Sequence, residues 1–76
     1  MMTSTFESPS LDTPSGQIAT HFMQWKGIED FRCIDMEKAD GFVWYYLFEV
    51  EDQRVEVCVE YVVDAEKWDV EVTRVT

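Results

Sequence analysis

The chain has 76 residues, which allows one domain at most. Its sixteen Asp and Glu residues outnumber six Lys and Arg residues, and the net charge of −10 disfavours direct binding to nucleic acid or to anionic membranes. Two cysteines are too few for the dense disulfide set of a small secreted domain, and no apolar run reaches the roughly 18 residues of a membrane span.

Residues 1–16 are rich in Ser, Thr and Pro, and beyond the initial methionines Phe6 and Leu11 are their only large apolar residues. Such a composition buries too little apolar surface to offset the entropy lost on ordering, so we expect a flexible tail. The tail lacks the basic and apolar regions of a secretory signal, which predicts a cytoplasmic protein. Residues 17–76 are expected to form a single α+β domain.

A short helix is predicted where the tail ends. Thr13 and Pro14 are residue types favoured at the N-cap and at the first helical position, and Gly27 suits the end of a helix. Apolar residues recur between them at helical spacing: Ile18, Phe22 and Trp25, with Ala19 and Met23 beside them. We expect this stripe to face the core.

From residue 31 onwards, apolar and polar residues alternate with the period of two that is typical of strands. Four strands are predicted, over residues 31–36, 42–51, 54–63 and 68–75. The connections are short and contain turn-forming residues, so neighbouring strands are expected to pair antiparallel. The predicted fold is α+β, with a short N-terminal helix packed on a four-stranded antiparallel meander sheet.

Loop lengths predict the register of this sheet. A five-residue loop at 37–41, a two-residue loop at 52–53 and a four-residue loop at 64–67 all place the large apolar residues on one face. In the first strand these residues are Ile34 and Met36. The helix is shorter than the strands, so part of the apolar face is expected to remain uncovered.

The other face is predicted to combine carboxylates with apolar groups. In this register Glu49 lies opposite Glu56, and Glu60 lies opposite Glu71. The first strand is expected to add Phe31, Cys33 and Asp35. Because like charges directly opposite each other destabilise a sheet, their accumulation favours a use in recognition. The predicted partner-binding residues are the carboxylates Glu49, Glu56, Glu60 and Glu71 and the anchors Tyr45 and Leu47.

Two other interpretations of this face are open. It is the plain solvated side of a one-sided sheet, whose charges maintain solubility and discourage edge pairing. Alternatively, it is a site for a hard cation. Such a site needs several oxygen ligands that converge on one point, whereas side chains on neighbouring strands stand parallel. We therefore predict no metal, and the absence of a Gly-rich phosphate loop predicts no cofactor.

The sequence contains no evident catalytic constellation. His21 is the single histidine and lies on the predicted helix. Neither Cys33 nor Cys58 has a CxxC partner or a basic neighbour that would lower its pKa, and the predicted register separates them too far for a disulfide. Trp44 and Trp68 are expected in the core rather than in a stacking platform, which would need a basic groove. A non-enzymatic protein is predicted.

The leading functional prediction is a small acidic inhibitor or adaptor that docks its carboxylate-rich face on a basic, nucleic-acid-handling protein. Spaced carboxylates can imitate a phosphate backbone. By analogy of size and charge alone, phage-encoded inhibitors of host defence, nuclease immunity proteins and small accessory subunits share this profile. The alternative is a structural subunit or homodimer that permanently buries the apolar part of the same face: Val43, Tyr45, Leu47, Cys58 and Val62.

Overall fold

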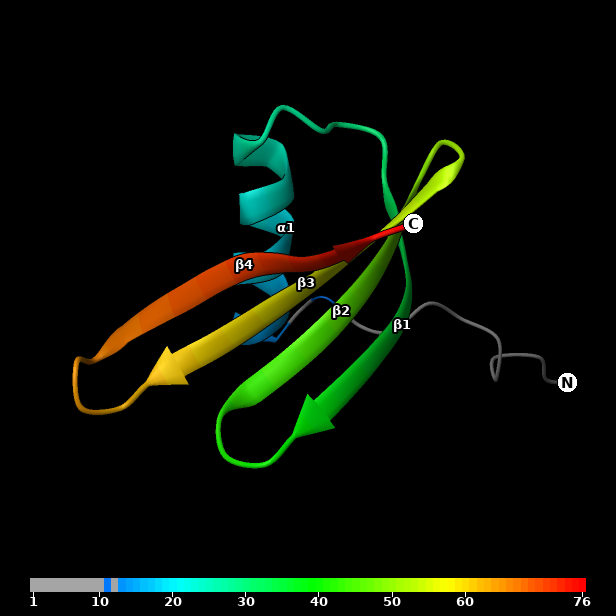
Figure 1. Cartoon of the computed structure of the whole chain (residues 1–76). Helices are drawn as coiled ribbons and strands as arrows, with labels where there is room; N and C mark the ends of the chain where they lie inside the picture. Colours follow the sequence, from blue (N-terminus) through cyan, green and yellow to red (C-terminus); the bar gives the residue numbers. More distant parts are fainter. Residues whose placement is uncertain (1–10, 12) are drawn as a thin grey trace, which may run out of the picture.

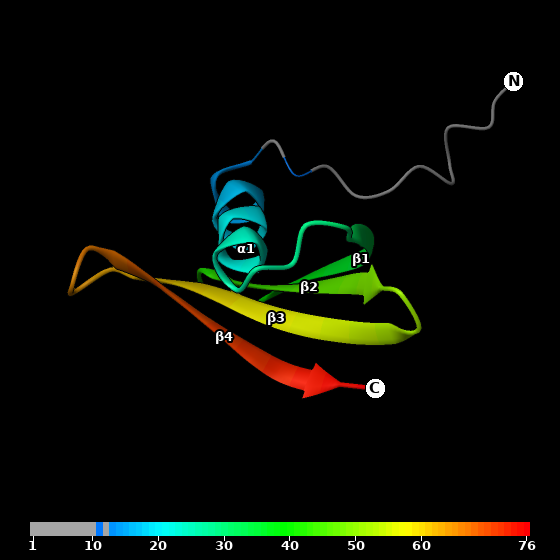
Figure 2. The ribbon, with the colours of Figure 1, turned by 90° about the horizontal axis from the view of Figure 1, so that it is seen from above.

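The computed structural model describes residue 11 and residues 13–76. One helix precedes four strands: α1 (Pro14–Trp25), β1 (Arg32–Ala39), β2 (Val43–Val50), β3 (Gln53–Val62) and β4 (Lys67–Val75). The strands form one antiparallel sheet in the order β1-β2-β3-β4, and α1 lies across one of its faces (Figure 1, Figure 2). The predicted α+β fold is confirmed. The predicted flexible tail falls largely on residues 1–10 and 12, which lie outside the described residues.

Helix α1 begins with the predicted cap. Thr13 has an extended backbone, and its Oγ1 accepts a hydrogen bond from the Gly16 N–H at 3.1 Å, which satisfies a donor that the first turn leaves unpaired. Pro14 occupies the first helical position, where its missing N–H has no consequence. Past the other end, Gly27 adopts a φ of 85°, a left-handed conformation that glycine tolerates without a steric penalty.

The buried stripe of α1 differs from the prediction. Ser15, Ala19 and Met23 face the sheet and are buried, whereas Trp25 is 75% exposed. Ile18 and Phe22 of the expected core stripe pack against the core and are half-buried, whereas the expectation for Trp25 is wrong: the centre of the buried face lies about one residue, or about 100° around the helix, from the predicted stripe. Small side chains at Ser15 and Ala19 let the helix approach the sheet closely, and the larger residues flank the contact.

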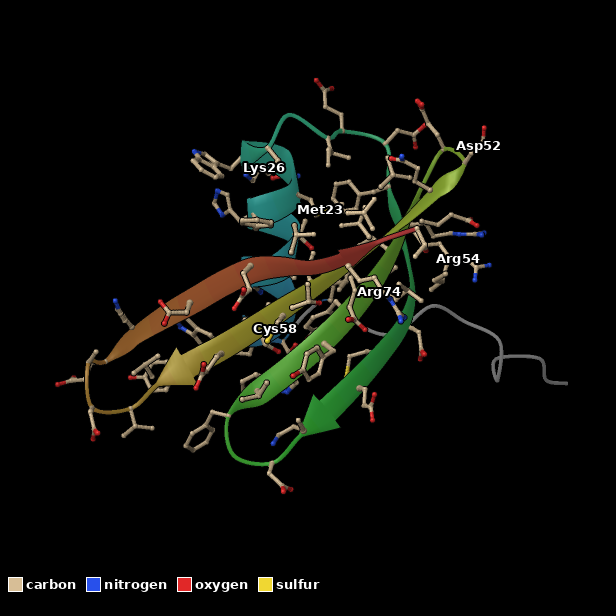
Figure 3. All side chains as sticks on the ribbon, viewed as in Figure 1. Met23, Lys26, Asp52, Arg54, Cys58 and Arg74 are labelled. Atoms are coloured by element: carbon tan, nitrogen blue, oxygen red, sulfur yellow. The ribbon has the colours of Figure 1, made fainter. Side chains whose placement is uncertain are left out.

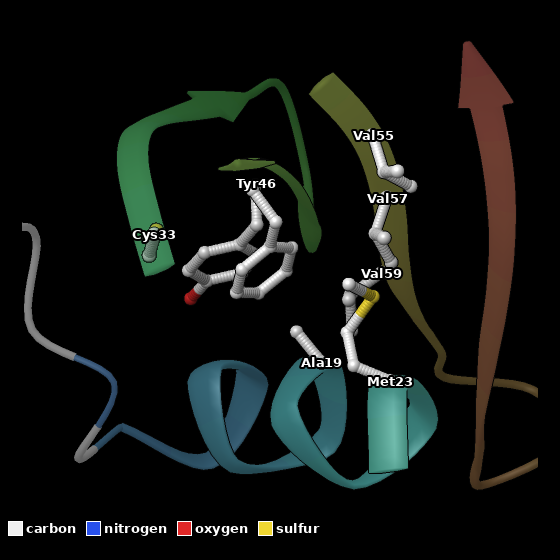
Figure 4. Close-up of a cluster of buried hydrophobic side chains, with 8 residues drawn as sticks. Ala19, Met23, Cys33, Tyr46, Val55, Val57 and Val59 are labelled. Atoms are coloured by element: carbon white, nitrogen blue, oxygen red, sulfur yellow. The ribbon is translucent and has the colours of Figure 1, made fainter. Parts of the chain in front are cut away.

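The core lies between α1 and the two central strands (Figure 4). Its buried members are Ala19, Met23, Cys33, Tyr46, Phe48, Val55, Val57 and Val59. Val55, Val57 and Val59 alternate along β3 with less buried residues, which confirms the predicted inward face of that strand. The hydroxyl groups of Ser15 and Tyr46 share a buried hydrogen bond of 2.6 Å.

The register between β2 and β3 differs from the prediction by two residues. The loop consists of Glu51 and Asp52, so Glu49 lies opposite Arg54, and Glu56 lies opposite Leu47. The predicted pairing of Glu49 with Glu56 is wrong. A shift of two residues leaves every side chain on its predicted face, because strand side chains alternate with a period of two.

The β3–β4 hairpin shows the same shift. Its loop spans residues 63–66, so Glu60 lies opposite Asp69, and Glu71 lies opposite Cys58. The predicted pair of Glu60 with Glu71 is therefore wrong, although a pair of opposing carboxylates remains. A bulge near Thr73 then shifts the register along the rest of β4.

A bulge in β1 overturns two further predictions. The pairing of β1 with β2 shifts between Cys33 and Asp35, which leaves Ile34 as the extra residue. Cys33 consequently points into the core and is 3% exposed, whereas strict alternation places it on the outer face. Phe31 also packs toward the core, with an edge-to-face contact of 5.3 Å to the Phe48 ring. The loop to β2 has three residues, 40–42, instead of the predicted five.

Candidate protein-binding face

The sheet face opposite α1 is covered by no other described element (Figure 2). We call it the open face. The strand pairings place the following residues on it: Arg32, Asp35, Glu37 and Ala39 of β1, Val43, Tyr45, Leu47 and Glu49 of β2, Arg54, Glu56, Cys58, Glu60 and Val62 of β3, and Lys67, Asp69, Glu71 and Arg74 of β4. Charged residues and apolar residues therefore share this surface.

An apolar stripe runs along the middle of the open face. It consists of Val43, Tyr45 and Leu47, which follow one another on the same side of β2 and are all half-buried. Cys58 of β3 lies directly opposite Tyr45 and widens the stripe there. The side chains are partly covered by their neighbours and still reach solvent, which makes them available as anchors in an interface.

Six carboxylates flank this apolar stripe on both sides: Asp35 and Glu37 on β1, Glu56 and Glu60 on β3, and Asp69 and Glu71 on β4. Glu37 lies opposite Tyr45, and Glu60 lies between Val43 and Asp69. Side chains directly opposite each other stand about 5 Å apart, where two carboxylates in water repel each other by about 0.8 kcal/mol. The open face therefore holds an unfavourable charge arrangement around its apolar centre.

The bases of the open face lie toward its two ends, and one of them, Arg74 of β4, lies directly opposite Glu56. Arg32 binds Glu49 through an ion pair of 2.6 Å, and Arg54 lies opposite Glu49 on the other side. Figure 3 shows Arg54 and Arg74 at one end of the sheet and Cys58 further along it. Lys67, near the other end, lies 3.8 Å from Asp69.

Within the described residues no ion pair involves Glu37, Glu56, Glu60 or Glu71, so these four carboxylates, like Asp35, are available to an outside base. Glu56 does accept a hydrogen bond of 2.8 Å from the Thr73 hydroxyl, which holds its side chain in place. A salt link with a partner would therefore break no internal ion pair of these four residues.

The electrostatic coupling of these groups centres on Cys58. Partial burial raises the pKa of the Cys58 thiol, and the negative charges of Glu71, Glu60 and Glu56 raise it further, while a hydrogen bond with Tyr45 opposes the rise. The pKa of Tyr45 is also raised, chiefly by Cys58. Both groups stay neutral at physiological pH, so the centre of the open face presents uncharged, polarisable side chains inside a ring of carboxylates.

The structure brings together five of the six residues predicted from the sequence: Tyr45, Leu47, Glu56, Glu60 and Glu71. Glu49 shares the face but lies among the arginines. Sequence reasoning missed Glu37, because it placed this residue in a turn. The alternation of Asp35, Met36 and Glu37 was the available signal that β1 continues past residue 36.

Other chemistry has less support in the described part of the chain. It contains no group of three or more His, Cys, Asp or Glu residues placed to hold a metal ion. Cys33 and Cys58 are free thiols, and burial is the main cause that raises the pKa of Cys33. No described helix has the length and hydrophobicity needed to cross a membrane.

The helix side of the sheet has a second surface feature, an open hollow of about 340 Å³. Four aromatic residues line it, namely Phe42, Trp44, Tyr61 and Trp68, together with the first turn of α1. We call it the aromatic hollow. Trp44 and Trp68 were expected in the core and are half-buried at its edge instead. The signal for this hollow was the difference in length between the helix and the strands.

Comparison of this chain with models of protein families, with curated proteins and with solved structures finds no match. The geometry and charge of the two surfaces are therefore the guide to function.

Proposed function

We propose that this protein is a small non-enzymatic inhibitor or adaptor that docks its open face on a basic protein. The observation that carries the proposal is the group of carboxylates that form no ion pair with any described residue, Glu37, Glu56, Glu60 and Glu71, around the half-buried Tyr45. A solvated face needs no central apolar stripe, and a simple apolar contact needs no surrounding carboxylates. An interface with a basic partner uses both.

The two kinds of side chain have different roles in such an interface. The carboxylates, together with the net charge of −10, create a field that attracts a basic protein and raises the association rate at low salt. Tyr45 and Leu47 supply the contact area, since aromatic and apolar anchors surrounded by polar groups contribute most of the energy of an interface. A basic partner also relieves the repulsion between Glu60 and Asp69, so docking replaces an unfavourable interaction with favourable ones.

A nucleic-acid-handling protein is the partner that this surface fits best. Its binding site carries Lys and Arg residues spaced to meet phosphates. Asp35 and Glu37 of β1, and Asp69 and Glu71 of β4, each repeat at about 6.7 Å along their strand, and Glu60 and Asp69 face each other about 4.8 Å apart across strands, which presents spaced negative charge to that site. The mode of action that follows is competition with nucleic acid, as in a phage-type counter-defence inhibitor or nucleic-acid mimic.

The test uses two variants with equal charge change. The first carries Glu60→Lys and Glu71→Lys, both exposed at the centre of the open face. The control carries Glu29→Lys and Asp30→Lys, both exposed in the segment between α1 and β1. The tagged wild-type chain captures partners from a native cell extract at low salt, and high salt releases them. Binding of each released protein to both variants is then measured in purified form.

We expect the open-face variant to lose at least tenfold in association rate, while the control loses only the smaller part that depends on net charge. We also expect the wild-type chain to displace nucleic acid from the captured protein. Equal losses in the two variants would show that net charge alone drives the contact. Binding that is indifferent to ionic strength would contradict the proposal.

The second candidate function is a structural subunit or homodimer, which the half-buried stripe of Val43, Tyr45 and Leu47 favours. In a symmetric dimer the same patch of both copies meets, which brings the two sets of carboxylates together. This repulsion is the reason for ranking self-association second. Sedimentation of the purified chain separates the two functions, because a dimer that persists on dilution and is broken by Leu47→Glu favours the structural role.

A further inference from the structure

We propose that the aromatic hollow is a second recognition site, and that it accepts an arginine side chain of a basic partner protein. This site lies on the helix side of the sheet and does not depend on the open face. Its location follows from element lengths. A helix of 12 residues spans about 18 Å, while a strand of 10 residues spans about 33 Å, so the sheet extends beyond the first turn of α1.

The walls of the hollow are aromatic and form one connected strip. The rings of Trp44 and Trp68 lie 5.8 Å apart, those of Tyr61 and Trp68 lie 5.0 Å apart, and Phe42 contacts Tyr61 edge to face at 6.2 Å. Phe42 is 53% exposed, so the strip remains open to solvent at one end. The volume of about 340 Å³ lies within the usual range of side-chain and small-ligand sites.

Acidic residues outnumber bases at this end of the sheet, where Lys67 is paired with Asp69 and Lys38 lies over Trp44, so a cation is favoured over an anion. The two turns at this end of the sheet, residues 40–42 and 63–66, contribute Asp40, Asp64 and Glu66 (Figure 1). At the α1 wall, Pro14 has no N–H to offer an anion, and the N–H groups of Gly16 and Gln17 already donate to Thr13.

Cationic side chains already lie over aromatic rings within this protein. Two of its three lysines lie over rings: Lys38 Nζ is 5.2 Å from the centre of Trp44, and Lys26 Nζ is 5.2 Å from that of Trp25. Lys38 Nζ is also tied to the carbonyl groups of Ala39 and Gly41, at the edge of the hollow. A cation is therefore stable beside this strip, and the remaining rings are unoccupied by any described lysine or arginine.

Arginine fits better than lysine. Aromatic rings line the hollow, and a planar guanidinium stacks on aromatic faces while its N–H groups stay free to pair with carboxylates of the neighbouring turns. An ammonium group is more strongly hydrated and loses more on leaving water. The proposal thus predicts an order of binding: arginine first, then lysine, with neutral side chains last.

The experiment follows the tryptophan indole N–H signals of the full-length protein by NMR. Four capped pentapeptides are added, each with glycines around one central residue: arginine, lysine, phenylalanine or citrulline, the neutral analogue of arginine. We expect the arginine peptide to shift the Trp44 and Trp68 signals with millimolar affinity, the lysine peptide to act more weakly, and the citrulline and phenylalanine peptides to have little effect. The Trp25 signal is the internal reference.

Two variants test the residues of the hollow, and a third is the control. Trp68→Leu and Phe42→Leu should weaken the arginine peptide about five- to thirtyfold, the factor expected from one cation–π contact. Trp25→Leu removes an exposed ring outside the hollow and should leave binding unchanged. Phe42 is half exposed, so we expect Phe42→Leu to keep the fold. If Trp68→Leu unfolds, the comparison is made with Phe42→Leu alone.

Several results would overturn the inference. Equal shifts with the citrulline or phenylalanine peptide would show an apolar site, and no shift with any peptide would show no site. Indole signals that move on dilution without peptide would identify a second copy of the chain as the occupant. The amide signals of Tyr45 and Leu47 report separately on the open face, so failure at one site does not count against the other.

Discussion

The hydroxyl groups of Ser15 and Tyr46 share a hydrogen bond of 2.6 Å that joins the first turn of α1 to the central strand β2. Both residues are almost fully buried. Buried hydroxyl groups destabilise a fold unless they are paired, so the helix start and the strand must meet in one arrangement. This contact fixes where α1 lies along the sheet, and therefore how much of the aromatic strip beyond it stays open.

Removing either partner should destabilise the protein. We expect Ser15→Ala to lower the free energy of unfolding by about 1–3 kcal/mol, because it leaves the Tyr46 hydroxyl buried without this partner. Tyr46→Phe should lower it less, since Ser15 keeps a contact of 3.3 Å with the Thr13 hydroxyl. Urea unfolding followed by far-ultraviolet circular dichroism measures both values.

The double variant is the control for this pair. Because it removes both hydroxyl groups, its loss should be smaller than the sum of the two single losses. Additive losses would mean that the two hydroxyl groups do not interact in solution.

The corrected register gives a prediction of opposite sign for two glutamates on the same face. Glu60→Gln removes the repulsion with Asp69 and should raise the free energy of unfolding by about 0.2–1 kcal/mol at low salt. Glu49→Gln breaks the ion pair with Arg32 and should lower it by up to about 1 kcal/mol. Both differences should shrink at 1 M NaCl, where the screening length is about 3 Å.

Asp64→Asn, in the β3–β4 turn, is the reference for the general effect of removing one negative charge. If Glu49→Gln stabilised the protein more than Glu60→Gln, the result would favour the register in which Glu49 lies opposite Glu56, and the register with Glu49 opposite Arg54 would be wrong.

The β2–β3 turn contains a strained residue. Glu51 has a φ of 53°, a left-handed conformation that costs a residue with a side chain about 1–2 kcal/mol. Glu51→Gly relieves this strain. Glycine also makes the unfolded chain more flexible, which lowers the free energy of unfolding by about 0.5–1 kcal/mol. We expect a net gain of about 0.5–1 kcal/mol in the free energy of unfolding, measured by urea titration.

Asp52→Gly is the matched control for the turn. Asp52 is not among the described residues with positive φ, so glycine there relieves no such strain and should lower the stability. A gain at Asp52 equal to that at Glu51 would show that the effect does not arise from the backbone conformation.

The fold and most of the open face could be predicted because they depend on the period of the sequence. Alternation placed Tyr45, Glu56 and Glu60 on the open face even though the β2–β3 loop was predicted one residue too late. The resulting register error of two residues leaves each side chain on the same face of the sheet. The bulge at Ile34 could not be predicted, because one extra residue leaves no compositional trace, and it moved Cys33 into the core. The rotation of α1 was missed because hydrophobicity favoured Trp25, whereas close packing favoured Ala19.

The thiol of Cys58 reports on the electrostatics of the open face. Because partial burial and the nearby carboxylates raise its pKa, the folded protein keeps this thiol protonated to a higher pH than the unfolded chain does. The associated stability is complete below about pH 8.5, the ordinary pKa of a cysteine, and is lost as the pH rises through the folded-state value. Alkylation by iodoacetamide, resolved by mass spectrometry, should therefore reach half its maximal rate at a higher pH than in a cysteine peptide.

Variants around Cys58 should move this midpoint in opposite directions. Glu71→Gln and Glu60→Gln each remove a negative charge and should lower the pKa of the thiol, whereas Tyr45→Phe removes a hydrogen bond that lowers the pKa and should raise it. Glu29→Gln, in the segment before β1, is the control and should have no effect. If the pH midpoint of Cys58 alkylation did not change in the Glu60 and Glu71 variants, these carboxylates would not interact with the thiol. The ring of charge around the centre of the open face would then be wrong. The opposite responses to charge removal and hydrogen-bond removal together distinguish this local coupling from a general change in stability, which would shift alkylation of the buried Cys33 as well.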